Sequence, residues 1–128
     1  MTRIDETIKR HDKGYNCAQA IACTYCDLVG MDEETMFKVA EGLGLGVGCM
    51  EGTCGAISGA VIVAGLLSNG NRTGSISKNI VSLFEAKSGA TICKNLKGIG
   101  TGKILCSCPQ CVYNAIVALE ESLANLNK

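Results

Sequence analysis

The chain has 128 residues with 12 basic and 12 acidic side chains, so its formal net charge is zero. This length suits one domain, residues 1–128, that buries a core without disulfide support. The balanced charge and an aromatic content of 4% argue against nucleic acid as a partner, because nucleic-acid binding needs a basic surface and stacking side chains. The densest apolar run, residues 60–67, is far too short to cross a bilayer, and we expect no membrane insertion.

The nine cysteines are the unusual feature of this composition. In a small secreted protein they would indicate a disulfide framework. Here their number is odd, and residues 1–14 are charged throughout with no apolar signal region. We therefore predict a cytoplasmic protein with mostly reduced thiols. Cysteine-rich proteins of that compartment usually hold a metal or carry out redox chemistry.

Three helices are predicted before the glycine-rich part of the chain. Residues 2–13 place apolar side chains one turn apart in a charged segment, which is typical of a surface helix. Asn16 is a suitable N-cap for a second helix over residues 17–29. Asp32 caps a third helix, with acidic residues in its first turn. This helix ends where the glycine run begins, at Gly42.

The segment from Gly42 to Gly48 alternates glycine with apolar residues and predicts a flexible loop. Such a loop could form an anion-binding nest, but its spacing is wrong for a dinucleotide fingerprint and no strand precedes it. Thr53 is the predicted N-cap of the next helix, which extends to residue 68 and is uncharged. Gly55 and Gly59, with a parallel row of alanines, predict a smooth face for another backbone or a compact cofactor.

The rest of the chain also predicts helices. Ser75 opens a helix that ends at Gly89, and residues 91–96 form a short helix that carries Cys93. Pro109 occupies the expected first position of the last helix. Because no strand-like alternation persists, the fold is predicted to be all-α. We expect a single-domain bundle of five to six helices, with a Gly-rich loop before a buried central helix.

Three cysteines stand at or near predicted helix starts. Cys54 is expected just inside its helix, where the helix dipole and free N–H groups lower a thiol pKa; the alternative is a small buried apolar residue. Cys17 is likewise expected at the capped start of its helix. Cys108-Pro-Gln-Cys111 puts one thiol at a helix cap and another one turn deeper, which suits attack by the first and resolution by the second. The same spacing could form half of a metal site.

The remaining candidate groups receive less weight. Cys23 and Cys26 are neighbours on one face of their predicted helix. Cys17 is half a turn out of phase with Cys26, so these three cannot serve one centre from a regular helix. Cys106 could be a further partner of the nearby C-P-x-C pair. His11, the single histidine of the chain, is interpreted as a surface residue.

Together these segments resemble the bacterial and archaeal C_GCAxxG_C_C family, for which redox activity is proposed. The similar segments are Gly14-Tyr15-Asn16-Cys17-Ala18-Gln19-Ala20, Cys54-Gly55-Ala56-x-x-Gly59, Cys93 before Leu96-x-Gly98, and Cys108-Pro109-x-Cys111-Val112. The resemblance implies four characteristic cysteines: Cys17, Cys54, Cys93 and Cys108. Cys49 and Cys111 match positions that only part of the family fills. Cys23, Cys26 and Cys106 match no family position.

Three functions agree with this pattern. The first, which we favour, is thiol–disulfide exchange or electron transfer with a protein redox partner, as a thiol oxidoreductase or an accessory protein. Cys54 and Cys108 would be the activated nucleophiles, and the resolving thiol would come from Cys17, Cys93 or Cys111. In the second, an iron–sulfur cluster or zinc is held by Cys17, Cys54, Cys93 and Cys108. The third is a non-catalytic partner subunit of an oxidoreductase or transporter.

Overall fold

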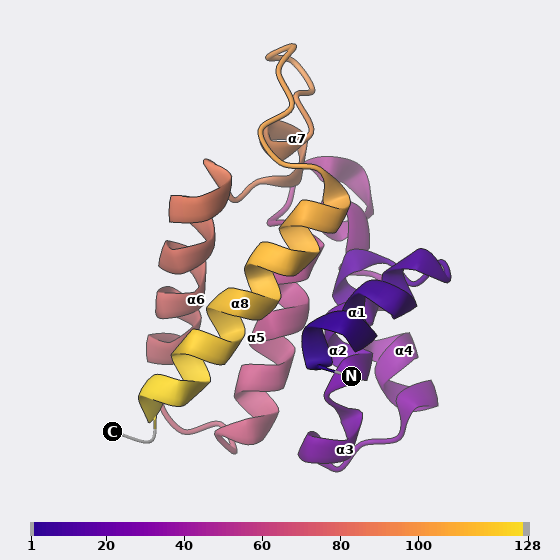
Figure 1. Ribbon diagram of the computed structural model, residues 1–128, viewed down its shortest axis with the longest axis vertical. Helices are drawn as coiled ribbons and strands as arrows, with labels where there is room; N and C mark the ends of the chain where they lie inside the picture. The colour runs from indigo at the N-terminus through magenta and orange to yellow at the C-terminus, as the bar shows by residue number, and fades with distance from the viewer. Residues whose placement is uncertain (1, 127–128) are drawn as a thin grey trace.

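The computed structural model describes residues 2–126, which form eight α-helices and one π-helical turn (Figure 1). Within this range the extended structure is limited to one isolated bridge between Thr53 and Ile92, so the predicted all-α class is confirmed. The elements are α1 (Arg3–Asp12), α2 (Cys17–Thr24), α3 (Cys26–Val29), α4 (Glu33–Glu41), η1 (Gly46–Met50), α5 (Gly55–Leu67), α6 (Thr73–Ser88), α7 (Cys93–Leu96) and α8 (Cys108–Leu126). No helix described here combines the length and the apolar character needed to cross a membrane.

Helix α5 is the centre of the packing. It contacts α2 on one side and both α6 and α8 on the other, and Figure 1 shows α8 crossing in front of it. Its small side chains are fully buried, among them Ala56, Ala60 and Ala64. A helix that is apolar all round is stable only in such an interior. The predicted buried central helix is therefore present.

Gly59 allows α5 to approach α2 closely. A Cβ atom at this position would lie 2.6 Å from the carbonyl oxygen of Ala18 and 3.1 Å from its Cα. Backbone atoms cannot rotate away, so a side chain here would force the two helices apart. The smooth face predicted around Gly59 thus accommodates the backbone of α2.

Replacing Gly59 by alanine is expected to destabilise the fold by about 1–3 kcal/mol, the usual cost of overpacking a core. Gly65 provides a matched control on the same helix, because its Cβ would lie 3.7 Å from Thr73 Cγ2, an ordinary contact. Gly65→Ala should instead stabilise by roughly 0.5–1 kcal/mol through helix propensity. Urea unfolding of both variants checks the difference, and equal effects would contradict the close approach of α2 and α5.

The second predicted helix, residues 17–29, is in fact two helices separated at Tyr25. Tyr25 leaves helical geometry at φ −101° and ψ 7°, and its side chain is 1% exposed. Its hydroxyl donates a hydrogen bond to Glu120, and Arg3 lies 4.9 Å from the ring centroid. The break thus occurs where Tyr25 is anchored between two distant helices.

The glycine-rich segment is compact rather than an open loop. It includes the π-helical turn η1, and Leu45 and Val47 adopt left-handed backbone conformations with φ of 55° and 60°. A Cβ on Gly46 would lie 2.6 Å from Cys93 Cβ. Glycine is therefore required where this turn packs against the start of α7. Farther along, α6 begins at Thr73, two residues before the predicted Ser75.

A candidate active site lined by five cysteines

Five cysteine side chains line one cavity of about 170 Å³. They are the five that the sequence predicted as catalytic: Cys17, Cys54, Cys93, Cys108 and Cys111. Four of them stand where a helix begins, as the first residue of α2, α7 or α8 or as the N-cap of α5, and Cys111 lies one turn into α8. The structure therefore brings together thiols that are far apart in the sequence.

A short backbone pairing places Cys54 beside Cys93. The N–H of Cys54 donates to Thr91 O at 2.8 Å, and the N–H of Cys93 donates to Gly52 O at 3.0 Å. Thr53 belongs to this pairing, so Cys54 and not the predicted Thr53 is the N-cap of α5. The side chain of Thr53 is therefore not needed as a cap.

Gly55 leaves room for a sulfur atom at the bottom of the cavity. A Cβ at Gly55 would lie 2.5 Å from Cys17 Sγ and 2.9 Å from Leu43 O. Glycine is thus the residue that allows Cys17 to reach the start of α5. Gly55 belongs to one of the segments that carry the family resemblance. The packing of Cys17 against α5 explains why this position is glycine.

The thiols form a connected row inside the cavity. Cys54 lies next to both Cys17 and Cys111, which are the neighbours that most affect its pKa. At the other end of the row, Lys97 Nζ donates to Cys111 Sγ at 3.8 Å, and Cys108 lines the cavity near the same ammonium group. The row therefore defines which groups are neighbours: Cys17 and Cys54, Cys54 and Cys111, and Cys111 and Lys97.

Two of the buried thiols, Cys54 and Cys17, are held in their neutral form. Hydrogen bonding to Cys111, with a further contribution from burial, raises the pKa of Cys54 to about 12, and the opposing effect of Cys17 does not offset this. Hydrogen bonding to Cys54 and burial also raise the pKa of Cys17. The lowered pKa predicted for Cys54 is therefore wrong. Its thiol is buried beside other sulfurs, and that outweighs its place at a helix start.

Lys97 is a site residue that the sequence analysis missed. It follows α7 as its C-cap, is partly buried and lines the cavity. Burial alone would lower its pKa, but Cys111 and Cys108 outweigh that effect and raise the pKa of Lys97. The ammonium group also counteracts the burial that raises the pKa of Cys93. The sequence signal that could have identified Lys97 is its spacing of four residues from Cys93, which places the two side chains on one face of a helical turn.

Four cysteines do not line this cavity. Cys49 is exposed on η1, with its thiol 3.7 Å from Gly46 O. Cys106 is buried but its side chain does not line the cavity: its sulfur accepts a hydrogen bond from Asn114 Nδ2 at 3.7 Å, and its backbone carbonyl accepts from Cys111 Sγ at 3.7 Å. Cys23 and Cys26 line a separate groove between α1 and the α2–α3 junction.

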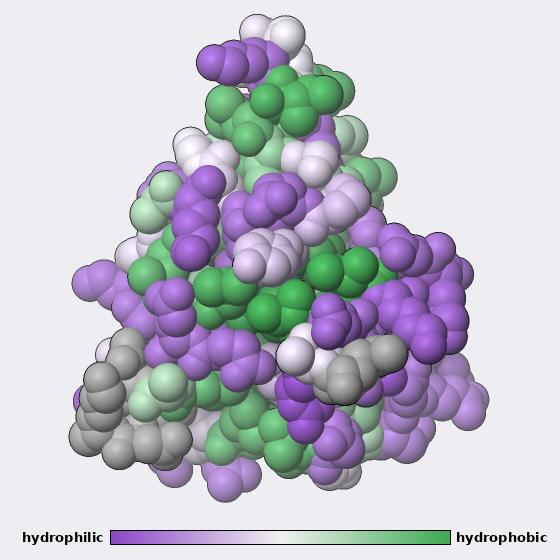
Figure 2. All heavy atoms as spheres, viewed as in Figure 1, coloured by the Kyte–Doolittle hydropathy of each residue, from purple (hydrophilic) through white to green (hydrophobic). Residues whose placement is uncertain are grey.

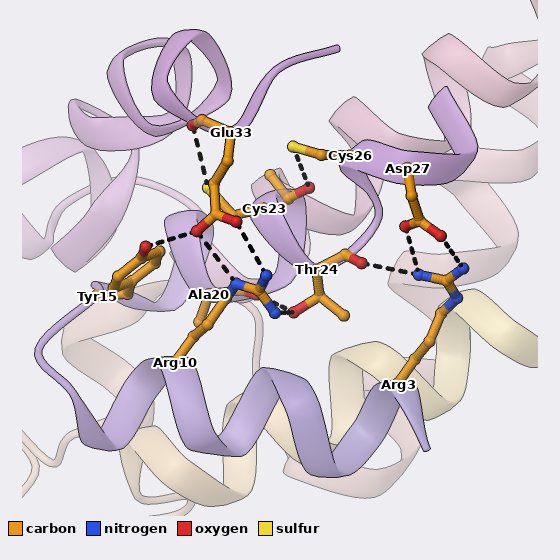
Figure 3. A network of polar contacts seen from close by, with 10 residues as sticks. Arg3, Arg10, Tyr15, Ala20, Cys23, Thr24, Cys26, Asp27 and Glu33 are labelled. Atoms are coloured by element: carbon orange, nitrogen blue, oxygen red, sulfur yellow. Dashed lines mark hydrogen bonds and ion pairs between the residues drawn. The ribbon is translucent and has the colours of Figure 1, made fainter. Parts of the chain in front are cut away.

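A polar network covers that separate pair (Figure 3). The carboxylate of Glu33 accepts a hydrogen bond from Arg10 Nη2 at 3.0 Å and another from the Tyr15 hydroxyl at 2.6 Å. The thiol of Cys23 donates to the backbone carbonyl of Glu33 at 3.9 Å. Burial is the main reason that the pKa of Cys23 is raised to about 12 and that the pKa of Cys26 is also raised. This pair therefore shares no centre with Cys17.

The raised thiol pKa values predict a loss of stability in alkali. Cys23 and Cys54 have ordinary values of 9.0 and folded values of about 12. Unfolding releases these thiols to ionise, so their contribution to stability is fully present below pH 9 and is lost between about pH 9 and 12. Urea unfolding should show a decrease of at least ~1.4 kcal/mol, the equivalent of one pKa unit. Cys23→Ser should flatten this pH dependence, and an unchanged slope would contradict the raised pKa.

The same cavity contains the residues of the metal-ligand alternative. Within residues 2–126, no group of three or more His, Cys, Asp or Glu side chains is placed to hold a metal ion. The predicted ligands Cys17, Cys54, Cys93 and Cys108 share the cavity without forming such a group. The single histidine, His11, also lines this cavity rather than lying only on the surface as interpreted.

Comparison with known protein families gives one match that covers most of the chain. Residues 15–122 match the family described as "Putative redox-active protein (C_GCAxxG_C_C)". The matched range contains every cysteine of the cavity. Neither the curated proteins nor the solved structures give a match.

Proposed function

Because this chain belongs to the C_GCAxxG_C_C redox-active family, we propose that it transfers two electrons by thiol–disulfide exchange. It would act as a thiol oxidoreductase or as an electron-transfer accessory protein for a protein redox partner. One observation carries this proposal: five thiols from separate parts of the chain meet in one cavity beside Lys97. We place the protein in the cytoplasm, where cellular reductants keep such thiols reduced.

Cys108 is the proposed attacking thiol. It is partly exposed, whereas the other four cavity cysteines are buried. It is also the first residue of α8, a helix of 19 residues whose positive end favours an anion. The ammonium group of Lys97 lies beside it. Accessibility and positive charge thus coincide at this sulfur, whereas Cys54, the other predicted nucleophile, is 2% exposed.

The proposed reaction has two steps. In the first, the Cys108 thiolate attacks one sulfur of a substrate disulfide, forms a mixed disulfide and releases one substrate thiolate, which takes up a proton. In the second, Cys111 gives up its proton and attacks Cys108 Sγ, which releases the second substrate thiol. The protein loses two electrons to the substrate, and both thiol protons end on the products. An external thiol reductant restores the starting state by the reverse exchange.

Cys54, Cys17 and Cys93 complete the proposed catalytic set. Cys54 adjoins Cys111, and Cys17 adjoins Cys54. Attack by Cys54 on the new disulfide would move it inward and return Cys108 to the thiol form. Because hydrogen bonding to neighbouring thiols and burial both disfavour the thiolates of Cys54 and Cys17, this inward step should be slower than the first exchange.

Thiol counting after reaction with 2-hydroxyethyl disulfide tests the proposal. The protein, purified without oxygen, should lose two thiols, and peptide mapping should find a disulfide between Cys108 and Cys111. Addition of dithiothreitol should restore both thiols. Unchanged thiol counts would overturn the proposal. Stoichiometric bound iron or zinc that is lost on Cys54→Ser would support the metal alternative instead.

A further inference from the structure

The loop of residues 98–107 is attached to the thiol cavity at both ends. It follows Lys97 directly and leads into Cys108, and both of these residues line the cavity. Figure 1 shows the loop projecting from one end of the molecule, beyond α7. Three of its large apolar side chains are exposed: Ile99 by 55%, Ile104 by 68% and Leu105 by 46%. Apolar surface that stays exposed to solvent does not contribute to the buried core of the fold.

The turn η1 and the residue before it contribute further apolar side chains. Leu45 and Val47 are 49% and 55% exposed, and Leu45 itself lines the cavity. Because η1 contacts α7, these side chains belong to the same end of the molecule as the loop, where Figure 2 shows apolar atoms gathered. We call this set the apolar rim: Leu45, Val47, Ile99, Ile104 and Leu105.

Charge is distributed unevenly along this neutral chain. Residues 86–119 include four lysines and no acidic residue, so the remainder has 12 acidic and eight basic side chains. Near the rim, Glu51 is paired with Lys94 at 3.2 Å. Lys97 at the base of the loop and Lys103 within it are therefore the charged side chains of residues 97–108, and both are positive.

We infer that the apolar rim docks an acidic, apolar segment of a partner protein that contains the reacting disulfide. This inference rests on the proposed function and adds the chemistry of the partner. Apart from Leu45, the rim lies outside the cavity, so a small disulfide would contact little of it, whereas a polypeptide would cover it. A second copy of this chain would present the same lysines, and the like charges would repel.

Two synthetic peptides test this inference. Both contain one cysteine between leucines, flanked by aspartates in one peptide and by lysines in the other, and each is linked to thionitrobenzoate through a disulfide. The protein is used with Cys49→Ser, which removes the exposed thiol outside the cavity. The rate of thionitrobenzoate release should be about tenfold higher for the acidic peptide at low salt, and the two rates should converge at high salt.

Two loop variants identify the surface. Lys103→Glu should remove most of the preference for the acidic peptide, and Ile104→Ser should slow the reaction of both peptides. Neither should change the reaction with 2-hydroxyethyl disulfide. If that small disulfide reacts but the peptides are not distinguished, the docking inference fails and the proposed function stands. If no disulfide reacts, the proposed function fails. Ile104-dependent binding to phosphatidylglycerol vesicles without peptide discrimination would also overturn the inference.

Discussion

Replacing Cys108 by serine is expected to reduce the rate of disulfide reduction by at least ~100-fold. A serine hydroxyl is not ionised at neutral pH and is a far weaker nucleophile than a thiolate. Because Cys108 is partly exposed at the start of α8, the substitution should leave the free energy of unfolding within about 0.5 kcal/mol of the parent. The rate is measured with 2-hydroxyethyl disulfide, and urea unfolding checks stability.

Two other serine variants distinguish the two steps. Cys49→Ser is the matched control, since Cys49 is exposed but lies outside the cavity, and its rate should equal that of the parent. Cys111→Ser should complete the first step only, so that a mixed disulfide on Cys108 accumulates and is detected by mass spectrometry. An active Cys108→Ser variant would show that another thiol attacks first.

The helix boundaries were predictable where local chemistry sets them. Asn16 and Asp32 cap α2 and α4 as predicted, each by accepting a backbone N–H three residues later. Gly89 ends α6 in a left-handed conformation. The break at Tyr25 was not predictable in this way. It depends on contacts with Arg3 and Glu120, which neighbouring residues in the sequence do not reveal.

The candidate site also has features that local sequence predicts and features that only the folded chain reveals. The five cavity cysteines could be selected because helix starts and cysteine spacing are local features. Their ionisation could not be predicted, because the pKa of Cys54 depends on Cys111 and Cys17, and their distances follow from the packing of α2, α5 and α8. Lys97 was missed for a related reason: only the folded chain shows that its ammonium group faces sulfur.

Lys97 gives the second prediction of large effect. Lys97→Met should lower the rate with 2-hydroxyethyl disulfide about tenfold at neutral pH and shift the pH at half-maximal rate upward. Lys97 Nζ donates to Cys111 Sγ at 3.8 Å, so its positive charge lies where the anionic sulfur of each exchange step forms. Without that charge, the exchange steps lose the cation nearest to their sulfurs, and we expect a higher pH to be needed for the same rate. A pH–rate profile measures this shift.

The shift in the pH profile is what separates a charge effect from a packing effect. Methionine keeps the length and apolar contacts of a partly buried lysine, so stability should be maintained or slightly increased. Lys97→Arg, which keeps the positive charge, should retain the parent profile. Lys94→Met is the control for a lysine engaged elsewhere, since Lys94 is paired with Glu51. A Lys97→Met rate that is lower by the same factor at every pH would mean that Lys97 positions the thiols sterically and does not stabilise a thiolate.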